Sequence, residues 1–256
     1  LMGHGFSALI LTNIRLLISG AVLILFAYLS DKEKFFAFLK DKSSYISLIL
    51  FAFLGLLLTQ LTYLIAIAET NAGTATVLQY VCPVGVLAYT CIKDRVGPTV
   101  SEIASMLLAI GGTFLIATHG QLNQLAITPK GLGWGLFSAF AYALYIILPL
   151  NLIKKWGSMP VIGVGMLLPG ILMVPFSGLV SFQGHYSSDN LLALFGLIVL
   201  GTIFAYTVFL KGTSMVGAVK GSLLASIEPI SAVFFAYMIM NDQFYAIDFI
   251  GMGMIL

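Results

Sequence analysis

Apolar residues fill most of the chain in long runs, and charged residues gather in the short stretches between those runs. A helix of about 20 apolar residues, rising about 1.5 Å per residue, crosses the roughly 30 Å hydrocarbon core of a bilayer. The pattern therefore predicts an all-α polytopic membrane protein. Its expected spans are 6–29, 45–68, 72–92, 100–118, 131–152, 160–180, 190–210, 217–240 and 246–256, the last of them incomplete.

The sequence also repeats itself at a fixed offset of 146 residues. Without any gap, the residues Leu48, Leu54, Gly55, Leu64, Ala72, Leu78 and Pro83 recur as Leu194, Leu200, Gly201, Leu210, Ala218, Leu224 and Pro229. The same offset places the counterpart of the helix at 131–152 before Leu1, so we expect a first helix that this chain lacks. The prediction is a ten-helix fold of two five-helix repeats, here residues 1–127 and 128–256.

Loop charge predicts how the two repeats are oriented. The loops after 6–29, 72–92, 131–152 and 190–210 hold ten basic residues, whereas the loops on the other side hold only Lys130. The positive-inside rule assigns the first group to the cytoplasm. Each repeat has an odd number of spans, so the second is inverted relative to the first, and both termini of the ten-helix protein are expected in the cytoplasm. Inverted repeats are typical of secondary transporters.

The composition argues against several other classes of protein. Hydrophobic residues make up 60% and charged residues 9% of the chain, whereas soluble domains carry about 25% charge. The basic residues are scattered, which disfavours a nucleic-acid partner, and Cys82 and Cys91 lie in an apolar segment, which disfavours a disulfide framework. His4, His119 and His185 look isolated, and neither metal-ligand spacing nor a P-loop occurs. We therefore expect no cofactor, no metal and no enzymatic activity.

Residues 30–44 combine four lysines with Phe35, Phe36, Phe38 and Leu39. This composition predicts an amphipathic segment on the inner leaflet, as a topology anchor or as a lipid-binding regulatory element.

Two charged residues are expected at membrane depth, where an unpaired charge is costly. Glu228 directly precedes Pro229 and could be a proton-coupling site or a structural hydrogen-bonding residue. Arg15 could bind a substrate carboxylate, extend to the interface, or pair with an acid such as Glu69. The sequence leaves these alternatives open.

Prolines and mildly polar side chains mark a candidate substrate path. Pro83 and Pro229 occupy the same repeat position and are candidate hinges, since proline removes a helical hydrogen bond. Polar and aromatic residues on the predicted spans form the candidate substrate-binding set: Gln60, Tyr63, Gln79, Tyr80, Ser138, Tyr142, Tyr206 and Ser226. Helix–helix contact is the alternative role for the serines of this set.

The stretch AIAETNAGTATVLQYVCPVGVLAYTCIKDRVGP, followed by SEIASMLLAIGGTFLIATHG, resembles the repeat unit of the EamA family in the drug/metabolite transporter superfamily. SIEPISA resembles the Glu-Pro of the family's ninth span, and LTNIRLL resembles its Arg-containing second span. Asp94 and Asp242 stand where the family usually has Glu, and Cys82 precedes the first proline. The resemblance implies a ten-helix carrier with cytoplasmic termini that moves small metabolites, often by export, along a path between the halves.

Together these features predict a secondary active transporter, with export of small metabolites such as amino acids as the favoured direction, in the bacterial cytoplasmic membrane. The expected partners are a small-molecule substrate, the lipid bilayer and, if Glu228 couples, protons. A monomer is compatible with the sequence, which leaves the oligomeric state open. The alternatives are an intramembrane lipid-modifying enzyme and a membrane receptor, neither of which explains an inverted repeat.

Overall fold

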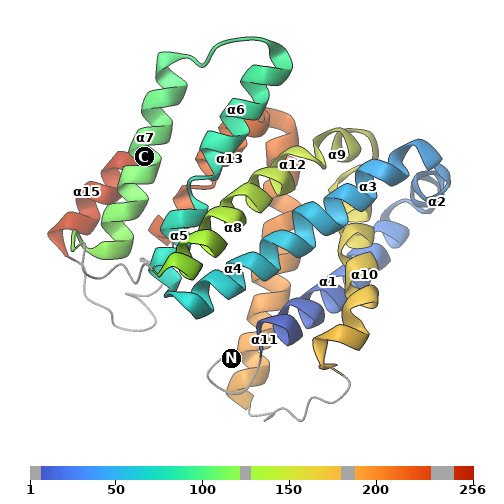
Figure 1. Ribbon diagram of the computed structural model, residues 1–256. Helices are drawn as coiled ribbons and strands as arrows, with labels where there is room; N and C mark the ends of the chain where they lie inside the picture. The colour runs from blue at the N-terminus through green and yellow to red at the C-terminus, as the bar shows by residue number, and fades with distance from the viewer. Residues whose placement is uncertain (1–6, 122–127, 180–187, 232–244) are drawn as a thin grey trace. The chain divides into compact units, whose positions relative to one another are not determined.

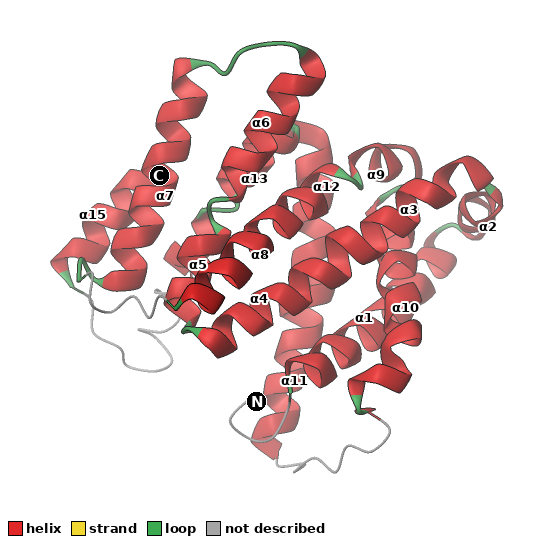
Figure 2. Cartoon of the chain, viewed as in Figure 1, coloured by secondary structure: helices red, strands yellow, loops and turns green. Residues whose placement is uncertain are grey.

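The computed structural model describes residues 7–121, 128–179, 188–231 and 245–256, and all regular secondary structure in these ranges is helical (Figures 1 and 2). Seven helical stretches within the described ranges are long and apolar enough to cross a bilayer. They are Leu9–Ser30, Lys42–Glu69, Gly73–Asp94, Val100–Thr118, Pro129–Trp156, Ser158–Ser177 and Leu191–Val216. The prediction of an all-α polytopic membrane protein is confirmed.

Several of these stretches are composed of shorter helical elements. The elements are α1 (Ala8–Ser30), α2 (Lys32–Lys40), η2 (Lys42–Ser44), α3 (Tyr45–Leu50), η3 (Phe51–Leu57), α4 (Leu58–Glu69), α5 (Ala72–Gln79), α6 (Cys82–Asp94), α7 (Val100–Thr118), α8 (Pro129–Ile147), α9 (Leu150–Trp156), α10 (Ser158–Ser177), α11 (Ser188–Ile198), η6 (Val199–Phe204), α12 (Ala205–Val216), α13 (Ala218–Leu224) and α15 (Ala246–Ile255). The predicted span at 217–240 is represented by α13 and by helical residues 227–231. Residues 232–240 of this span, as well as Asp242, His4 and His185, lie outside the described residues.

The chain forms two compact units, each assembled from both halves of the sequence. The first unit comprises Leu1–Leu61 and Leu144–Gly217, and the second comprises Thr62–Ala143 and Ala218–Leu256. The division therefore passes through α4 and α8. Neither unit coincides with one of the halves that are related by the 146-residue offset.

Close packing of α1 against α10 organises the first unit. A Cβ atom added to Gly20 would lie 2.7 Å from the backbone nitrogen of Leu167, and one added to Gly163 would lie 3.0 Å from that of Ile24. Small residues allow two helix backbones to approach this closely inside a membrane, where packing replaces the hydrophobic effect as the source of helix association. The glycines on both helices therefore fix the α1–α10 pair.

In the second unit, α7 and α15 cross at a pair of glycines. A Cβ atom at Gly112 would lie 2.5 Å from the carbonyl oxygen of Gly251, and one at Gly251 would lie 2.8 Å from the carbonyl oxygen of Gly112. Each position thus faces backbone of the other helix, which cannot move aside as a side chain can. Glycine at both positions is what permits the crossing.

The same two helices are also joined by polar contacts at the end of α7. The His119 ring nitrogen Nδ1 lies 2.8 Å from Oδ1 of the fully buried Asp248. The backbone N–H of Tyr245 donates to Oδ2 of Asp248 at 2.9 Å, which caps the start of α15. The interpretation of His119 as an isolated residue is therefore wrong, because its partner lies 129 positions further along the chain.

Two spans contain a wide π-helical turn in the middle. One is η3, between α3 and α4, and the other is η6, between α11 and α12. The repeat offset places Phe51–Leu57 onto residues 197–203, so the two wide turns coincide within two residues, at Gly55 and Gly201. Turns of this kind recur at functional sites in helices. The two halves of the sequence therefore share this π-helical turn as well as the repeated residues.

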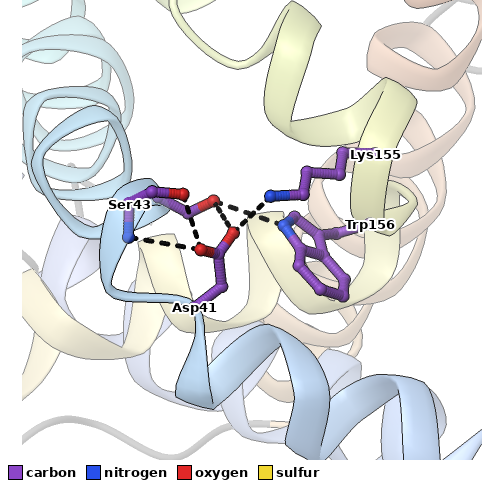
Figure 3. A network of polar contacts seen from close by, with 5 residues as sticks. Asp41, Ser43, Lys155 and Trp156 are labelled. Atoms are coloured by element: carbon purple, nitrogen blue, oxygen red, sulfur yellow. Dashed lines mark hydrogen bonds and ion pairs between the residues drawn. The ribbon is translucent and has the colours of Figure 1, made fainter.

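The predicted amphipathic segment forms α2 and buries two of its phenylalanines, Phe35 and Phe38. The segment that follows it is tied to α9 by the polar network in Figure 3. Asp41 accepts hydrogen bonds from the hydroxyls of Ser43 and Ser44, both at 2.6 Å, and pairs with the Lys155 ammonium, also at 2.6 Å. The bond from Lys155, assisted by those from the two serines, holds the pKa of the Asp41 carboxyl well below its ordinary value.

We expect Asp41→Asn to lower the melting temperature of the purified protein at neutral pH. The folded pKa of Asp41 lies below its unfolded value of about 3.9, so its stabilising effect is complete above that value and is lost as pH falls through the folded pKa. The Tm difference between wild type and variant should be constant above about pH 5 and shrink below about pH 4. Asp94→Asn, at the exposed end of α6, is the control. A difference that stays constant through the acidic range would contradict this role.

Candidate functional site

Two broken helices lie at the centre of the polar residues in the second unit. The first break, at Tyr80 and Val81, separates α5 from α6, and the second, at Ala225 and Ser226, separates α13 from the helical residues 227–231. The 146-residue offset places the first break within one residue of the second. Discontinuous spans at matching positions of two repeats are a common way for transporters to build a site at membrane depth.

Proline explains both breaks. Pro83 and Pro229 have no N–H to donate to the carbonyls four residues earlier, which are those of Gln79 and Ala225. The sequence predicts bends here, and in the structure each helix is interrupted by a turn of two residues. The Ala225 carbonyl oxygen instead accepts a hydrogen bond from the backbone N–H of Glu228 at 2.9 Å, because a buried carbonyl without a partner is costly.

Tyr80 joins the two breaks. Its hydroxyl lies 2.8 Å from the carbonyl oxygen of Ala225, the one released by Pro229, and 2.9 Å from Oε2 of Glu228. The Tyr80 side chain is 2% exposed, so it reaches these groups from a buried position. A carboxyl group on one broken helix is thus hydrogen-bonded to the other broken helix.

Other predicted site residues of the second unit form pairs beside the breaks. The Gln79 side-chain nitrogen donates to the hydroxyl of the fully buried Ser138 on α8 at 2.7 Å. The hydroxyls of Tyr63 and Thr76 lie 2.9 Å apart. Tyr142, half-buried, follows Ser138 by one helical turn on the same face of α8.

The first unit holds a second polar cluster, around Arg15. Its Nε donates to the Thr202 hydroxyl at 3.1 Å, and its Nη2 lies 3.5 Å from the Tyr206 hydroxyl. Thr202 lies in the wide turn η6 and donates in turn to the carbonyl of Leu197 at 2.8 Å. None of the three roles that the sequence left open for Arg15 involves these partners. Arg15 joins α1 to the irregular backbone of η6.

Aromatic rings extend this cluster, and the first unit also holds an unpartnered buried amide. The Tyr145 ring lies 5.3 Å from that of Tyr206 and 6.2 Å from those of Phe51 and Phe209. Gln60 is 3% exposed, and within the described part of the chain both polar atoms of its side chain are buried without a hydrogen-bond partner. A buried amide in this state costs about 1–3 kcal/mol, and water or a ligand normally satisfies it.

The structure thus brings together Gln79 with Ser138, Tyr80 with Glu228, and Arg15 with Tyr206. Ser226 resembles Gln60, because its hydroxyl is buried and has no partner among the described residues. Sequence reasoning missed Thr202, which nothing distinguishes from other membrane threonines, and Asp248, whose only signal is an acid at the start of an apolar helix. Across the described ranges, His, Cys, Asp and Glu form no group of three that could hold a metal ion.

Comparison with known proteins places these features in context. The sequence matches the EamA-like transporter family over residues 1–118 and 129–256. It is 36% identical to the uncharacterized inner membrane transporter YicL of Salmonella typhimurium, over 98% of this chain and 83% of that protein. It is 25% identical to the uncharacterized transporter YdfC of Bacillus subtilis, over 92% of this chain and 75% of that protein.

The fold is also shared with a protein of known structure. A protein whose crystal structure has been solved superposes with a TM-score of 0.79 at 14% sequence identity, over 96% of this chain and 84% of that one. At this level of identity the likeness supports the fold alone.

Proposed function

The chain belongs to the EamA-like transporter family, and on this premise we propose that it is a secondary active transporter that exports small metabolites, such as amino acids, by alternating access. The cytoplasmic membrane is the proposed location, in keeping with the inner membrane transporter YicL. Loop charge supports cytoplasmic termini for the complete ten-helix protein. The observation that carries the proposal is the contact of Tyr80 with the second broken helix.

The proposed substrate path is lined by the polar and aromatic set named from the sequence. Two members support this assignment directly, because Gln60 and Ser226 keep buried polar atoms without a protein partner in the described ranges. Such atoms are ready to bind a polar substrate or the water that precedes it. The pair formed by Gln79 and Ser138 offers further donors and acceptors that a substrate could compete for.

A substrate screen is the first test. Cells overexpressing the full-length protein are expected to export one or a few metabolites faster than cells carrying the empty vector. Tyr142→Ala should change that export, because it removes an aromatic ring from the proposed path while leaving the Tyr80 contacts in place. A variant that exports every affected metabolite like the wild type would remove Tyr142 from the path.

Proton coupling through Glu228 is the second part of the proposal. In proteoliposomes that contain the metabolite identified by the screen, Glu228→Gln is expected to abolish stimulation of transport by a pH gradient. Substrate exchange without a gradient should persist, because glutamine can still accept the Tyr80 hydrogen bond but cannot release a proton. Tyr80→Phe is the matched variant, which keeps the carboxyl group and removes its donor. If gradient stimulation survives Glu228→Gln, the role of Glu228 is structural.

A further inference from the structure

The two spans that contain the π-helical turns are unequally covered, although the 146-residue offset relates one to the other. One consists of α3, η3 and α4, and the other of α11, η6 and α12. Of the apolar 18-residue window in each span, 44% is buried in the first and 11% in the second. Exposure of apolar side chains to lipid is ordinary in a membrane protein, because lipid tails are as apolar as leucine. The difference between two related spans, however, needs an explanation.

The difference lies on one face of the second span. Val208 is 54% exposed, whereas its counterpart Thr62 is 1% exposed. Ala205 and Gly201, one and two turns earlier, are exposed as well, and the positions 146 residues before them are buried. Spacings of four and three residues place these three positions on one face of the helix. This face is therefore open in the second repeat and buried in the first.

In the first span, α8 packs on this face at Gly55. A Cβ atom added to Gly55 would lie 3.2 Å from the Cα atom of Tyr145 on α8, and the Phe51 and Tyr145 rings stack with their centroids 6.2 Å apart. A Cβ atom added to Gly201, by contrast, would approach only atoms of its own span among the described residues, at 3.8 Å or more. The repeat places the counterpart of α8 before Leu1. The face that α8 covers in one repeat thus has no helix on it in the other.

The second unit, taken by itself, shows the same asymmetry. A Cβ atom added to Gly135 on α8 would lie 2.7 Å from the Cβ atom of Leu78, so these two residues are in close contact. The repeat counterpart of Leu78 is Leu224 on α13, which is 64% exposed. Gly135 and Tyr145 both belong to α8, so two separate contacts of one helix lack their counterparts in the second repeat.

We propose that the open face of the α11–η6–α12 span is the seat of a transmembrane helix that precedes Leu1 in the complete protein. Glycine and alanine on this face would let the two helix backbones approach closely, as small residues do at helix contacts in membranes. The relative YicL is longer than this chain, which covers 83% of it, so that protein has residues outside the match. The proposal concerns how the fold is completed, and it depends neither on the transported substrate nor on proton coupling.

The repeat also predicts the register of this helix. α1 and α10 begin 150 residues apart, at Ala8 and Ser158, whereas the spans with π-helical turns follow the offset of 146 residues. These two offsets place the counterpart of Tyr145 between two and six residues before Leu1. We expect Gly201 to contact the helix in that interval, because its counterpart in the first span contacts α8 at Tyr145.

Disulfide trapping in the complete protein tests the proposal. Cys82→Ala and Cys91→Ser remove the two cysteines of this chain, and Ala205→Cys puts a thiol on the open face. A second cysteine is then moved through about ten residues before Leu1, which is nearly three helical turns. A protease site inserted between α7 and α8 allows the chain to be cut, so the two parts run together on a non-reducing gel only when a disulfide joins them. We expect the joined fraction to peak at positions about three or four residues apart, on one face of the scanned helix.

Leu200→Cys is the matched control on the same span. Leu200 is 65% exposed and its counterpart Leu54 is 41% exposed, so this position is open in both repeats. The joined fraction with Ala205→Cys should exceed that with Leu200→Cys by about fivefold or more, since a disulfide needs Cα atoms about 4.4–6.8 Å apart. Val208→Cys is a second reporter, which guards against a local disturbance at Ala205. Loop charge makes the two helices antiparallel, so the peak for Val208→Cys should fall about one turn earlier in the scanned helix.

Several results would overturn the proposal. One is a joined fraction that is no higher with Ala205→Cys and Val208→Cys than with Leu200→Cys. Another is a disulfide-linked dimer of intact chains formed by Ala205→Cys without a second cysteine, which would assign the open face to a second copy of the protein. A complete sequence with no apolar run of about 20 residues before Leu1 would exclude the proposed helix before any cysteine is introduced.

Discussion

Gly112→Leu is expected to separate α7 from α15 and to destabilise the protein strongly. A Cβ atom at this position would lie 2.5 Å from the carbonyl oxygen of Gly251. The rest of the leucine side chain would then clash with the backbone of α15. Overpacking a tight contact costs about 1–3 kcal/mol, and a contact with backbone lies at or above the upper end of this range. The loss should appear as a lower Tm of the protein purified in detergent, and as a smaller monodisperse fraction.

A second glycine on α15 provides the matched control. A Cβ atom added to Gly253 would have no heavy atom within 4 Å, so Gly253→Leu adds the same side chain to the same helix without the clash. It should leave Tm nearly unchanged. Equal losses in the two variants would show that leucine is harmful anywhere on these helices, and that the crossing at Gly112 has no special role.

Arg15→Ala is expected to have the second largest effect, through the joint between α1 and η6. The substitution removes the donors to Thr202 and Tyr206, at 3.1 and 3.5 Å, and the stacking of the guanidinium 6.0 Å from the Tyr206 ring. Hydrogen bonds to a charged group contribute about 1.5–3 kcal/mol, so we expect the free energy of unfolding to fall by about 2 kcal/mol. Arg15→Lys should recover only part of this, because an ammonium does not reproduce the planar fork of arginine.

The kinetic consequence distinguishes a structural Arg15 from a substrate-binding one. The donors of Arg15 already have protein partners, so the KM for the metabolite identified by the screen should stay within about twofold of the wild type while Tm falls. The opposite pattern, a KM that rises many-fold at unchanged Tm, would assign Arg15 to the substrate. Tyr206→Phe, which removes one acceptor and keeps the ring, should lie between wild type and Arg15→Ala in stability.

The sequence predicted the architecture because hydrocarbon constrains it strongly. Every backbone polar group in a bilayer must be satisfied within the protein, so a long apolar run has to be helical, and the runs alone located the spans. Prolines were equally informative. The positions of Pro83 and Pro229 marked where helices depart from regularity, although the structure interrupts both helices where a bend was expected.

The polar contacts were much harder to predict, and the reason is physical. Arg15 and Thr202 are 187 residues apart, and His119 and Asp248 are 129 apart, so their pairing depends on how whole helices pack. A polar residue in a membrane span is costly unless it has a partner, but its position in the sequence does not identify that partner. Sequence reasoning could therefore name Gln79 and Tyr80 as candidate substrate-binding residues and Glu228 as a coupling or structural residue. Their hydrogen bonds emerged only from the packed structure.

The wide turns η3 and η6 change the direction in which the side chains that follow them point. A π turn accommodates an extra residue, and each additional residue of an α-helix corresponds to a rotation of about 100° around the axis. Gln60 and Tyr206, which follow the turns, therefore point in a different direction from the one that a regular helix started at Tyr45 or Ser188 would give them. The face of each span that packs against its neighbours is therefore rotated after the turn. A single helix can in this way contact neighbours in different directions at its two ends.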